Sequence, residues 1–484
     1  MFKSTAIVTL ILCLCCTGLL AEDAAVSQSS ADDVVKPKKS VWPAYAKMRF
    51  TEDYSQTANA KHRDVFDALK NISIGDDPDW YASFGGQVRI RYEDYQNFNF
   101  GRPAVNDDGY VLQRYFLHAD MHFGKAFRIF TEIRSAWATD WDLSNSTAPH
   151  PLNFHDEFDF MNLFGELNLN LSDDLMATIR AGRWEMNYGM GRVIGCRDWS
   201  QTRRPFDGVS ARLNSGKNWI DGFWANWVQV HQYEAFNSSD EDIQSWGVYA
   251  HLQQGGRLPF NTELYLLGKD NTTGSRDDHR ITIGGRVFST IKDTDFSYDV
   301  EGAYQFDYQG TDVSAGFFAA ELTYKFKQYD TKPWISAGFD WASGDGDSTD
   351  GQINTYEPVS AFGHYYFGYI DQIGRQNIVS PWLRLGFKPI KKLTTIAEVH
   401  WFWAEQAADG IYSPCNCSKV MRGGVAGANS FIGTELDLLV KYKLDHHTML
   451  MAGYSYLWAG DYVDDTGSGT DDVQRVYVQM QFNF

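Results

Sequence analysis

The sequence of 484 residues has little cysteine and proline, no excess of positive charge and, after its first 21 residues, no long apolar run. A membrane-spanning α-helix needs about 20 consecutive apolar residues, so a bundle of such helices is excluded. The 62 acidic residues outnumber the 43 basic ones, which gives a net charge of −19. This balance argues against nucleic acid as a partner, because nucleic-acid binding calls for a basic surface.

Aromatic residues and glycine are abundant instead. The chain contains 16 Trp, 26 Tyr, 32 Phe and 42 Gly, against only 13 Pro. Aromatic residues are enriched in strands, so this composition favours a β-barrel or a β-sandwich. The length exceeds the roughly 100–200 residues of one ordinary compact core, which leaves several domains, a repeat array or one large barrel.

The first 21 residues have the features of a secretory signal peptide. Lys3 supplies the positive start, residues 6–20 are apolar, and Ala21 is a small residue at a cleavage site before Glu22. The apolar stretch is too short to span a membrane as a helix. We therefore expect residues 1–21 to direct export and to be removed.

Residues 22–79 are expected to form an N-terminal tether in the periplasm. The first part is rich in Ser, Asp and Lys, a composition typical of disorder. One short helix is expected within residues 53–69. Three cysteines follow the signal peptide, and the sequence leaves their disulfide state open: Cys196, Cys415 and Cys417.

From residue 80 to the C-terminus, apolar and polar side chains alternate in one segment after another. In the first of these segments, Val88, Ile90 and Tyr92 alternate with polar residues. A period of two predicts a strand with one apolar face. Eighteen strands are predicted in this way, at 83–95, 110–123, 126–139, 160–171, 174–185, 206–214, 219–232, 243–254, 259–270, 278–290, 295–308, 313–327, 333–343, 378–388, 391–404, 429–444, 447–459 and 471–484.

Short and long connections alternate between these strands. Gly124-Lys125 forms a tight turn, whereas 140–159 and 344–377 are long, and only Gln309 to Asp312 is short where a long connection is due. Outer-membrane barrels have this asymmetry. The sequence therefore predicts an all-β fold, a transmembrane antiparallel β-barrel of about 18 strands over residues 80–484. Short turns would face the periplasm and long loops the exterior, in the lipid of the outer membrane of a Gram-negative-type bacterium.

If the apolar row of each strand faces lipid, the polar row faces the lumen. The strands within 83–214 point mostly arginines inward: Arg89, Arg91, Arg114, Arg128, Arg134, Arg180 and Arg212. The strands at 295–308 and 313–327 point mostly acids inward: Asp299, Glu301, Asp307 and Glu321. The long connection 186–205 adds four more arginines: Arg192, Arg197, Arg203 and Arg204. We expect an arginine wall opposite an acidic wall, with this loop tightening a cationic constriction.

Arginine suits the passage of anions because it is always charged and its planar donor fork matches a carboxylate. A ladder of such sites lets a polyanion move from one to the next, provided that each site releases it. The alternative interpretation is that the lumen charges pair as arginine–carboxylate bridges and satisfy one another. We expect the arc as a whole to prefer anions.

Three blocks of the sequence resemble the alginate export family of outer-membrane porins. The first runs Ala181-Gly-Arg-Trp-Glu-Met-Asn-Tyr-Gly-Met-Gly-Arg-Val-Ile-Gly, through Asp198-Trp199, to Arg204-Pro-Phe-Asp-Gly208. The second is Trp341-Ala-Ser-Gly-Asp-Gly-Asp, Asp350-Gly351, His364-Tyr-Tyr-Phe-Gly-Tyr-Ile-Asp371 and Asn377. The third is Phe84-Gly-Gly-Gln-Val-Arg-Ile-Arg-Tyr-Glu93. Together the blocks cover about residues 80–400, which is nearly the whole barrel.

The resemblance implies a monomeric eighteen-stranded barrel through which an acidic, alginate-like polysaccharide leaves the periplasm. His364, Asp371 and Asn377 would belong to an external loop with a structural role. A periplasmic export assembly stays open as a further partner, and the many lumen acids leave other anionic or neutral sugars open as substrates. The inward row and the resemblance together place ten residues on the expected substrate path: Arg89, Arg91, Arg114, Arg134, Arg180, Arg183, Arg192, Arg204, Asp207 and Arg212.

No cofactor, metal site or enzyme activity is expected. The acidic stretch Asp345 to Gly351 lacks the spacing and the glutamate of a calcium loop. His446-His447 lies at a periplasmic turn and is interpreted as solvated rather than as a metal pair. A lipid hydrolase would need a Ser–His pair on the lipid face, which the pattern does not offer. The alternatives are a general or other-sugar porin, or a binding or receptor barrel.

Overall fold

The structure is a computed structural model. It describes residues 41–143, 154–255, 258–274, 277–310, 312–360, 362–414 and 420–484. The predicted signal peptide, the first part of the predicted tether, Cys415 and Cys417 lie outside the described residues. In the described part of the chain, no helix is long and apolar enough to cross a membrane.

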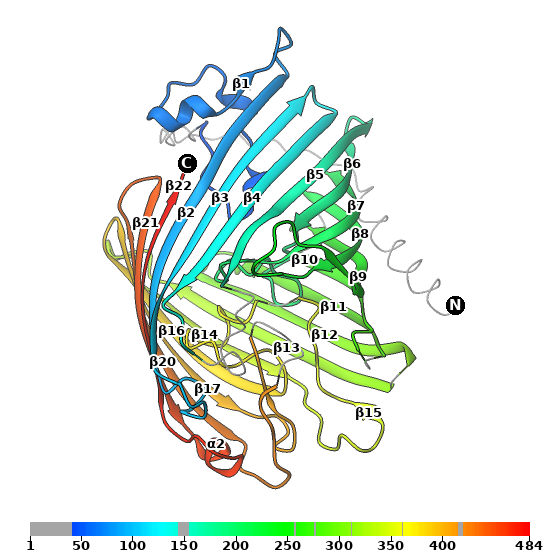
Figure 1. Ribbon diagram of the computed structural model, residues 1–484. Helices are drawn as coiled ribbons and strands as arrows, with labels where there is room; N and C mark the ends of the chain where they lie inside the picture. Colours follow the sequence, from blue (N-terminus) through cyan, green and yellow to red (C-terminus); the bar gives the residue numbers. More distant parts are fainter. Residues whose placement is uncertain are drawn as a thin grey trace.

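Eighteen antiparallel strands form one closed barrel (Figure 1). They are β2 (Trp80–Gln96), β3 (Asp108–Phe123), β4 (Phe127–Thr139), β5 (Asp156–Ser172), β6 (Leu175–Glu185), β7 (Pro205–Ser215), β8 (Asn218–Val228), β9 (Ser239–Leu252), β10 (Asn261–Asn271), β11 (Asp278–Thr290), β12 (Phe296–Gly310), β13 (Asp312–Lys325), β14 (Trp334–Ala342), β16 (Ile378–Ile390), β17 (Leu393–Trp403), β20 (Phe431–Lys443), β21 (Thr448–Ala459) and β22 (Val473–Asn483). Each predicted strand overlaps one of these, so the predicted fold class is confirmed.

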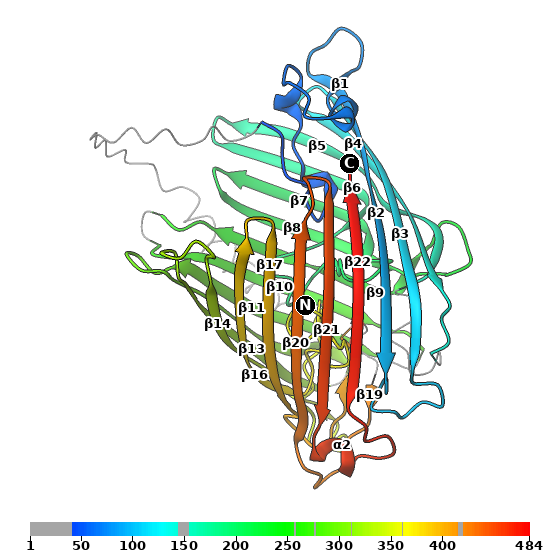
Figure 2. The same cartoon turned by 90° about the vertical axis from the view of Figure 1, so that its left-hand side faces the viewer.

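The barrel closes between its first and last strands. β2 pairs with β22 in the register Gln87↔Asn483 to Gln96↔Gln474, and Figure 2 shows β22 between β21 and β2. Closure leaves neither strand with an unpaired edge, which is the condition for a sheet to cross the hydrocarbon of a bilayer. The short external connection expected near residue 311 is present, because one residue separates β12 from β13.

The two faces of the strands follow the period of two in the sequence. On β2, the apolar Ile90 and Tyr92 are exposed, whereas the intervening Arg89 and Arg91 are buried in the interior. Successive side chains of a strand point to opposite faces, so one row meets lipid and the other row meets the lumen. The predicted assignment of the two rows therefore matches the structure on this strand.

Residues 41–79 lie at the same end of the barrel as the C-terminus (Figure 1). They contain three short 3-10 helices, η1 (Arg49–Thr51), η2 (Ser55–Thr57) and η3 (Val65–Leu69), and the two-residue β1 (Ile72–Ser73). The stretch 53–69 thus holds two separate turns in place of one helix. Asp64 starts the second turn, because its side chain accepts a hydrogen bond from the Phe66 N–H.

The opposite end carries the long loops. It contains the short helix α2 (Asp461–Asp465), the parallel strand β15 (Gln352–Ile353) beside β13, and a small hairpin of β18 (Ile411–Tyr412) and β19 (Val420–Arg422). Two of these connections turn back into the barrel. They are named here the third external loop (residues 186–204) and the seventh external loop (residues 343–377).

Candidate functional site

The third and seventh external loops meet inside the barrel and pair through their backbones. Ile194 forms a parallel bridge with Ser360. The Gly195 N–H donates to the Ser360 carbonyl at 2.7 Å, and the Ser360 N–H donates to the Val193 carbonyl at 2.8 Å. Apolar side chains from both loops, including Ile194 and Val359, pack in the interior. The loops therefore form one inner layer, and this layer narrows the lumen.

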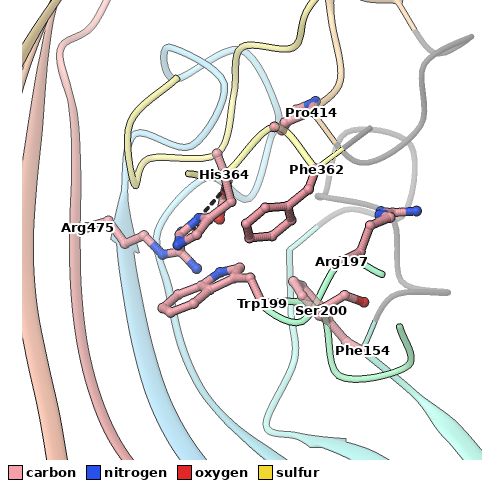
Figure 3. Close-up of a pocket in the computed structure, with 10 residues that line it drawn as sticks. Phe154, Arg197, Trp199, Ser200, Phe362, His364, Pro414 and Arg475 are labelled. Carbon is pink, nitrogen blue, oxygen red and sulfur yellow. Dashed lines mark hydrogen bonds and ion pairs between the residues drawn. The ribbon is translucent and has the colours of Figure 1, made fainter. Parts of the chain in front are cut away.

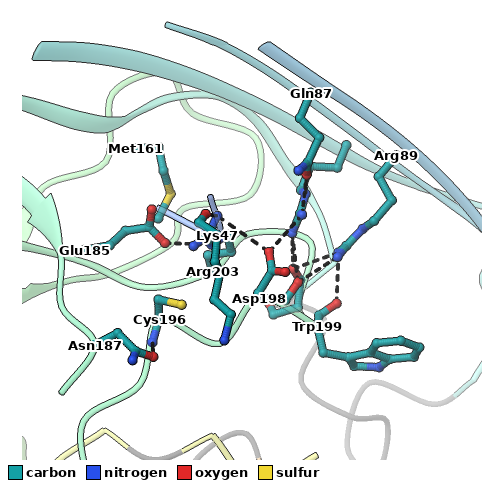
Figure 4. A network of polar contacts seen from close by, with 12 residues as sticks. Lys47, Gln87, Arg89, Met161, Glu185, Asn187, Cys196, Asp198, Trp199 and Arg203 are labelled. Atoms are coloured by element: carbon teal, nitrogen blue, oxygen red, sulfur yellow. Dashed lines mark hydrogen bonds and ion pairs between the residues drawn. The ribbon is translucent and has the colours of Figure 1, made fainter. Parts of the chain in front are cut away.

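Arg89 and Arg114 of the barrel wall hold the third external loop. Arg89 donates to the carbonyls of Asp198 (2.6 Å), Trp199 (2.9 Å) and Ser200 (2.9 Å), and Figure 4 shows Arg89 beside Asp198 and Trp199. Arg114 donates to the same Asp198 and Ser200 carbonyls, and it forms an ion pair with the Asp198 carboxylate at 3.0 Å. Both arginines are buried, with exposures of 2% and 0%. The loop takes up the donor groups of Arg89, whereas Arg114 also donates to Gln87 Oε1 of β2.

Trp199 joins the two loops to the wall by stacking. The Arg91 guanidinium lies 3.8 Å from the centre of the Trp199 ring, and the His364 ring of the seventh external loop stacks on Trp199 at 3.9 Å. Asp371 accepts from His364 Nδ1 at 2.6 Å and pairs with Arg475 of β22 at 2.7 Å. Burial lowers the pKa of His364 even beside Asp371. A neutral, buried imidazole thus completes the junction.

A pocket opens at this junction (Figure 3). Its lining combines aromatic rings with both signs of charge, and it includes Phe362, Trp199, His364, Asp371, Arg197 and Arg475. Asp371 already accepts from His364 and Arg475. Three charged or titratable side chains of the lining, Asp371, His364 and Arg475, are thus engaged with one another.

Arg134 and Arg192 also anchor the third external loop. Arg134 donates to the Thr202 carbonyl and pairs with Asp156 and Asp159 of β5. Arg192 extends from the loop to the opposite wall, where it pairs with Asp299 at 2.7 Å and Glu301 at 3.0 Å on β12. Asp299 and Glu301, two of the acids expected in the acidic wall, are therefore both paired with Arg192.

The remaining members of the expected path lie on β6 and β7 or directly before β7. The register places Arg183 opposite Asp207, Arg180 opposite Ser210, and Arg212 opposite Thr178. Arg204 precedes β7 and stacks on Trp227 at 3.9 Å. These side chains keep part of their surface, with exposures of 13% for Arg183, 19% for Arg180 and 39% for Arg212. Arg183 and Asp207 lie an odd number of residues from Arg180 and Arg212, and Arg183 pairs in register with the lipid-exposed Leu163. They therefore belong to the outward row of their strands. The set on the other row, Arg204, Arg180 and Arg212, is named here the β6–β7 row.

Three arginines on β6 and β7 each have a carboxylate partner. Arg183 Nε lies 2.7 Å from Asp207 Oδ1, Arg180 Nη2 lies 2.6 Å from Glu166 Oε1, and Arg212 Nη2 lies 2.6 Å from Asp221 Oδ2. A mobile carboxylate could bind here only by exchanging with or adding to these partners. Such sites bind weakly, and weak sites release what they bind.

The predicted site residues thus divide into two groups that the sequence does not distinguish. Arg89, Arg91, Arg114, Arg134 and Arg192 are buried at the inner loops, whereas the arginines on or next to β6 and β7 keep part of their surface exposed. Asp198 and Trp199 lie in a motif that the sequence singles out, but their contacts across the barrel have no local signal. Burial opposes the charge of Asp198, yet Arg203 and Arg114 hold its pKa well below its usual range.

Comparison with known proteins gives one family and a set of similar structures. A family model described as alginate export matches residues 80–476. Among solved structures, OccK9 (OpdG) of Pseudomonas aeruginosa is 13% identical with a TM-score of 0.57, covering 83% of this chain and 98% of that one. OccAB2 of Acinetobacter baumannii is 11% identical with a TM-score of 0.55, over 83% and 98% of the two chains. At these identities the likeness shows the fold alone. No protein with a curated function matches the sequence.

Proposed function

This chain belongs to the alginate export family and is a β-barrel protein of the Gram-negative outer membrane, and we propose that it passes an anionic, alginate-like oligo- or polysaccharide through its lumen. The observation that carries the proposal is the β6–β7 row. Its arginines remain partly exposed, whereas five other predicted path residues are buried: Arg89, Arg91, Arg114, Arg134 and Arg192.

The β6–β7 row has the chemistry that a polyuronate needs. Each sugar unit of such a chain carries a carboxylate, and guanidinium groups bind carboxylates through two parallel N–H donors. Consecutive inward positions of a strand are spaced by about 6–7 Å, since each residue advances about 3.3 Å. Arg180 pairs with Ser210, which is one inward position from Arg212, so a carboxylate of an extended chain can pass from Arg180 to Arg212.

Aromatic rings hold the guanidinium planes of this row. Arg180 lies 4.4 Å from the Phe164 ring centre, Arg204 lies 3.9 Å from Trp227, and Arg212 lies 4.4 Å from Trp219. A guanidinium stacked on a ring keeps its N–H edge directed outward. The donors beyond those that bond Glu166 or Asp221 can then meet a solute carboxylate in the plane. In this proposal the pore works without cofactor or chemical step, as a monomer whose single chain closes the lumen.

The test is single-channel conductance of the refolded protein in planar bilayers. We expect anion selectivity in the reversal potential, and block by alginate oligomers but not by a neutral oligosaccharide. The double variant Arg180→Gln with Arg212→Gln should weaken alginate block by about tenfold or more, because charge-assisted hydrogen bonds contribute about 1.5–3 kcal/mol each. Lys217→Gln removes one charge in the exposed β7–β8 turn and is the matched control.

The alternative is a general or other-sugar porin, and a specific observation favours it. Each arginine of the three pairs above already has a carboxylate partner, which reduces the net positive potential of the row. Under this alternative the channel conducts without selectivity, and alginate does not block it. That outcome would leave the barrel and its family membership standing while removing the anionic substrate.

A further inference from the structure

We propose that Asp64, His446 and His447 form a binding site for one divalent transition-metal ion, with Zn²⁺ as the best match, at the periplasmic end of the barrel. One imidazole nitrogen from each histidine and one carboxylate oxygen lie within 4.8 Å of one another. The site is separate from the β6–β7 row, so the proposal does not depend on which solute the pore carries.

The three side chains come from parts of the chain that are far apart. Asp64 lies in the N-terminal segment directly before η3, whereas both histidines lie in the turn between β20 and β21. His446 Nε2 lies 2.6 Å and His447 Nε2 lies 2.8 Å from the same oxygen, Asp64 Oδ2. The two rings are 4.0 Å apart between centres. Both imidazoles therefore present the same nitrogen to one point.

The second nitrogen of His447 indicates which form of the ring is present. His447 Nδ1 lies 2.6 Å from the Asn483 carbonyl oxygen, which can only accept a hydrogen bond. Nδ1 therefore carries the hydrogen. In the neutral ring Nε2 then holds a lone pair, and this lone pair faces a carboxylate oxygen that is also an acceptor. A cation between the two atoms removes this repulsion.

His446 supplies a second nitrogen with the same requirement. Its Nε2 is shielded from solvent and, although it is close to Asp64 Oδ2, makes no hydrogen bond of acceptable geometry. The side chain itself is 36% exposed, so an ion can enter from the periplasm. The alternative is that both rings are protonated and share Asp64 as a triple ion cluster, which places two like charges side by side.

The ligand set matches the chemistry of zinc. Two imidazole nitrogens and one carboxylate oxygen are the ligands of many three-residue zinc sites, in which water takes the fourth position. The Asn483 carbonyl that orients His447 is the outer partner that metal-bound histidines normally have. Zinc bonds of about 2.0–2.1 Å separate tetrahedral ligands by roughly 3.3 Å, so Asp64 would move by about half an ångström on binding.

Metal binding here would fasten the N-terminal segment to the barrel. Besides Asp64, this segment is held by Arg49, which donates to the Gly86 carbonyl at 2.8 Å and to the Phe484 carbonyl at 3.0 Å. The segment covers part of the periplasmic mouth, because Phe50 packs on Phe130 and Phe164 of the wall. A metal ion would thus set how firmly the segment stays in the mouth.

The experiment is a titration of the mature chain, without a polyhistidine tag, in detergent micelles. We expect ZnCl₂ to saturate at one ion per chain in calorimetry, and CoCl₂ to give the visible absorption of a tetrahedral site. His446→Ala, His447→Ala and Asp64→Asn should each weaken Zn²⁺ binding by about 10–100-fold or more, since even outer partners contribute that much. His62→Ala removes an exposed histidine of the same segment and is the control.

Hydrogen exchange measures directly how firmly the N-terminal segment is held to the barrel. Zn²⁺ should slow hydrogen exchange of residues 41–70 in the wild type and in His62→Ala, and leave it unchanged in Asp64→Asn. Heat-modifiable migration in gel electrophoresis checks that each variant has a folded barrel. Wild-type affinity in all three ligand variants, or no saturable Zn²⁺ binding at all, would overturn the proposal and leave an ion-paired cluster.

Discussion

Arg89 is an inward-facing arginine like those of the β6–β7 row, but its guanidinium bonds a loop of the same chain and is buried. Its N–H groups are bonded to three consecutive carbonyls of the third external loop. Carbonyls carry no full charge, so the hydrogen bonds to Arg89 act through their dipoles. At the scale of single residues, such arginines bind the loop rather than the solute.

Replacing Arg89 should release this part of the loop while the barrel stays folded. Arg89→Met removes the Arg89 donors, while the three carbonyls keep a donor from Arg114 or Arg91. We therefore expect the docked loop to lose roughly 1–3 kcal/mol. Residues 198–201 should then exchange hydrogen faster, and the conductance should rise and fluctuate. Lys325→Met removes an exposed cation near the end of β13 and should change neither. Unchanged exchange in Arg89→Met would contradict the anchoring role.

His364 makes the junction of the loops sensitive to acid. Burial lowers its pKa below the ordinary value of 6.5, so the docked loop disfavours the protonated ring. An undocked loop binds the proton more readily, and the docking free energy is therefore complete above about pH 6.5 and falls as the pH drops below it. We expect faster hydrogen exchange of residues 362–371 at about pH 5 than at pH 7.5, after correction for intrinsic rates.

The control for this pH dependence is His364→Gln. Glutamine keeps a donor for Asp371 but has no proton to gain, so its exchange should be nearly the same at the two pH values. An acid response that persists in His364→Gln would place the titrating group elsewhere.

At the scale of elements, the N-terminal segment behaves as part of the barrel interior. Phe50 is 5% exposed and meets Phe164 edge to face at 5.3 Å, and Arg180 lies 4.7 Å from its ring centre. The segment therefore contacts an arginine of the β6–β7 row as well as the wall. A change in its position would change the surroundings of that row.

Phe50→Ala should detach this segment. Truncating a buried phenylalanine costs about 3–5 kcal/mol, which corresponds to about 100-fold or more in the docking equilibrium. Trypsin should then cleave at Lys47 and Lys61 faster by a similar factor, with the barrel intact. Val65→Ala truncates a side chain of the same segment that is 78% exposed, and its cleavage rate should match the wild type. Equal rates for both variants would show that Phe50 does not hold the segment.

At the scale of the whole molecule, the asymmetry of the connections sets the orientation. The long loops and α2 lie at one end, and the N-terminal segment and the C-terminus lie at the other (Figure 1). Short turns face the periplasm in outer-membrane barrels, so the seventh external loop begins at the cell surface and then turns inward. The β7–β8 turn with Lys217 faces the periplasm.

Cysteine labelling of intact cells tests this orientation. In a background with Cys415→Ser and Cys417→Ser, Asp347→Cys should react with a membrane-impermeant maleimide, whereas Lys217→Cys should react only after lysis. Cys196 can stay, because it is buried at 1% exposure and burial raises the pKa of its thiol. Labelling of Lys217→Cys alone in intact cells would invert the assignment.

The sequence by itself determined the eighteen strands, the lipid and lumen faces, and the one short external connection near residue 311. These features are local, because a period of two and a turn depend only on neighbouring residues. It also identified the inward arginines. Their partners were decided by the tertiary structure alone: the Asp198 carbonyl is 109 residues from Arg89, and His447 is 383 residues from Asp64. Such contacts arise only when loops and termini fold back into the closed barrel, and no local pattern encodes where a loop comes to rest.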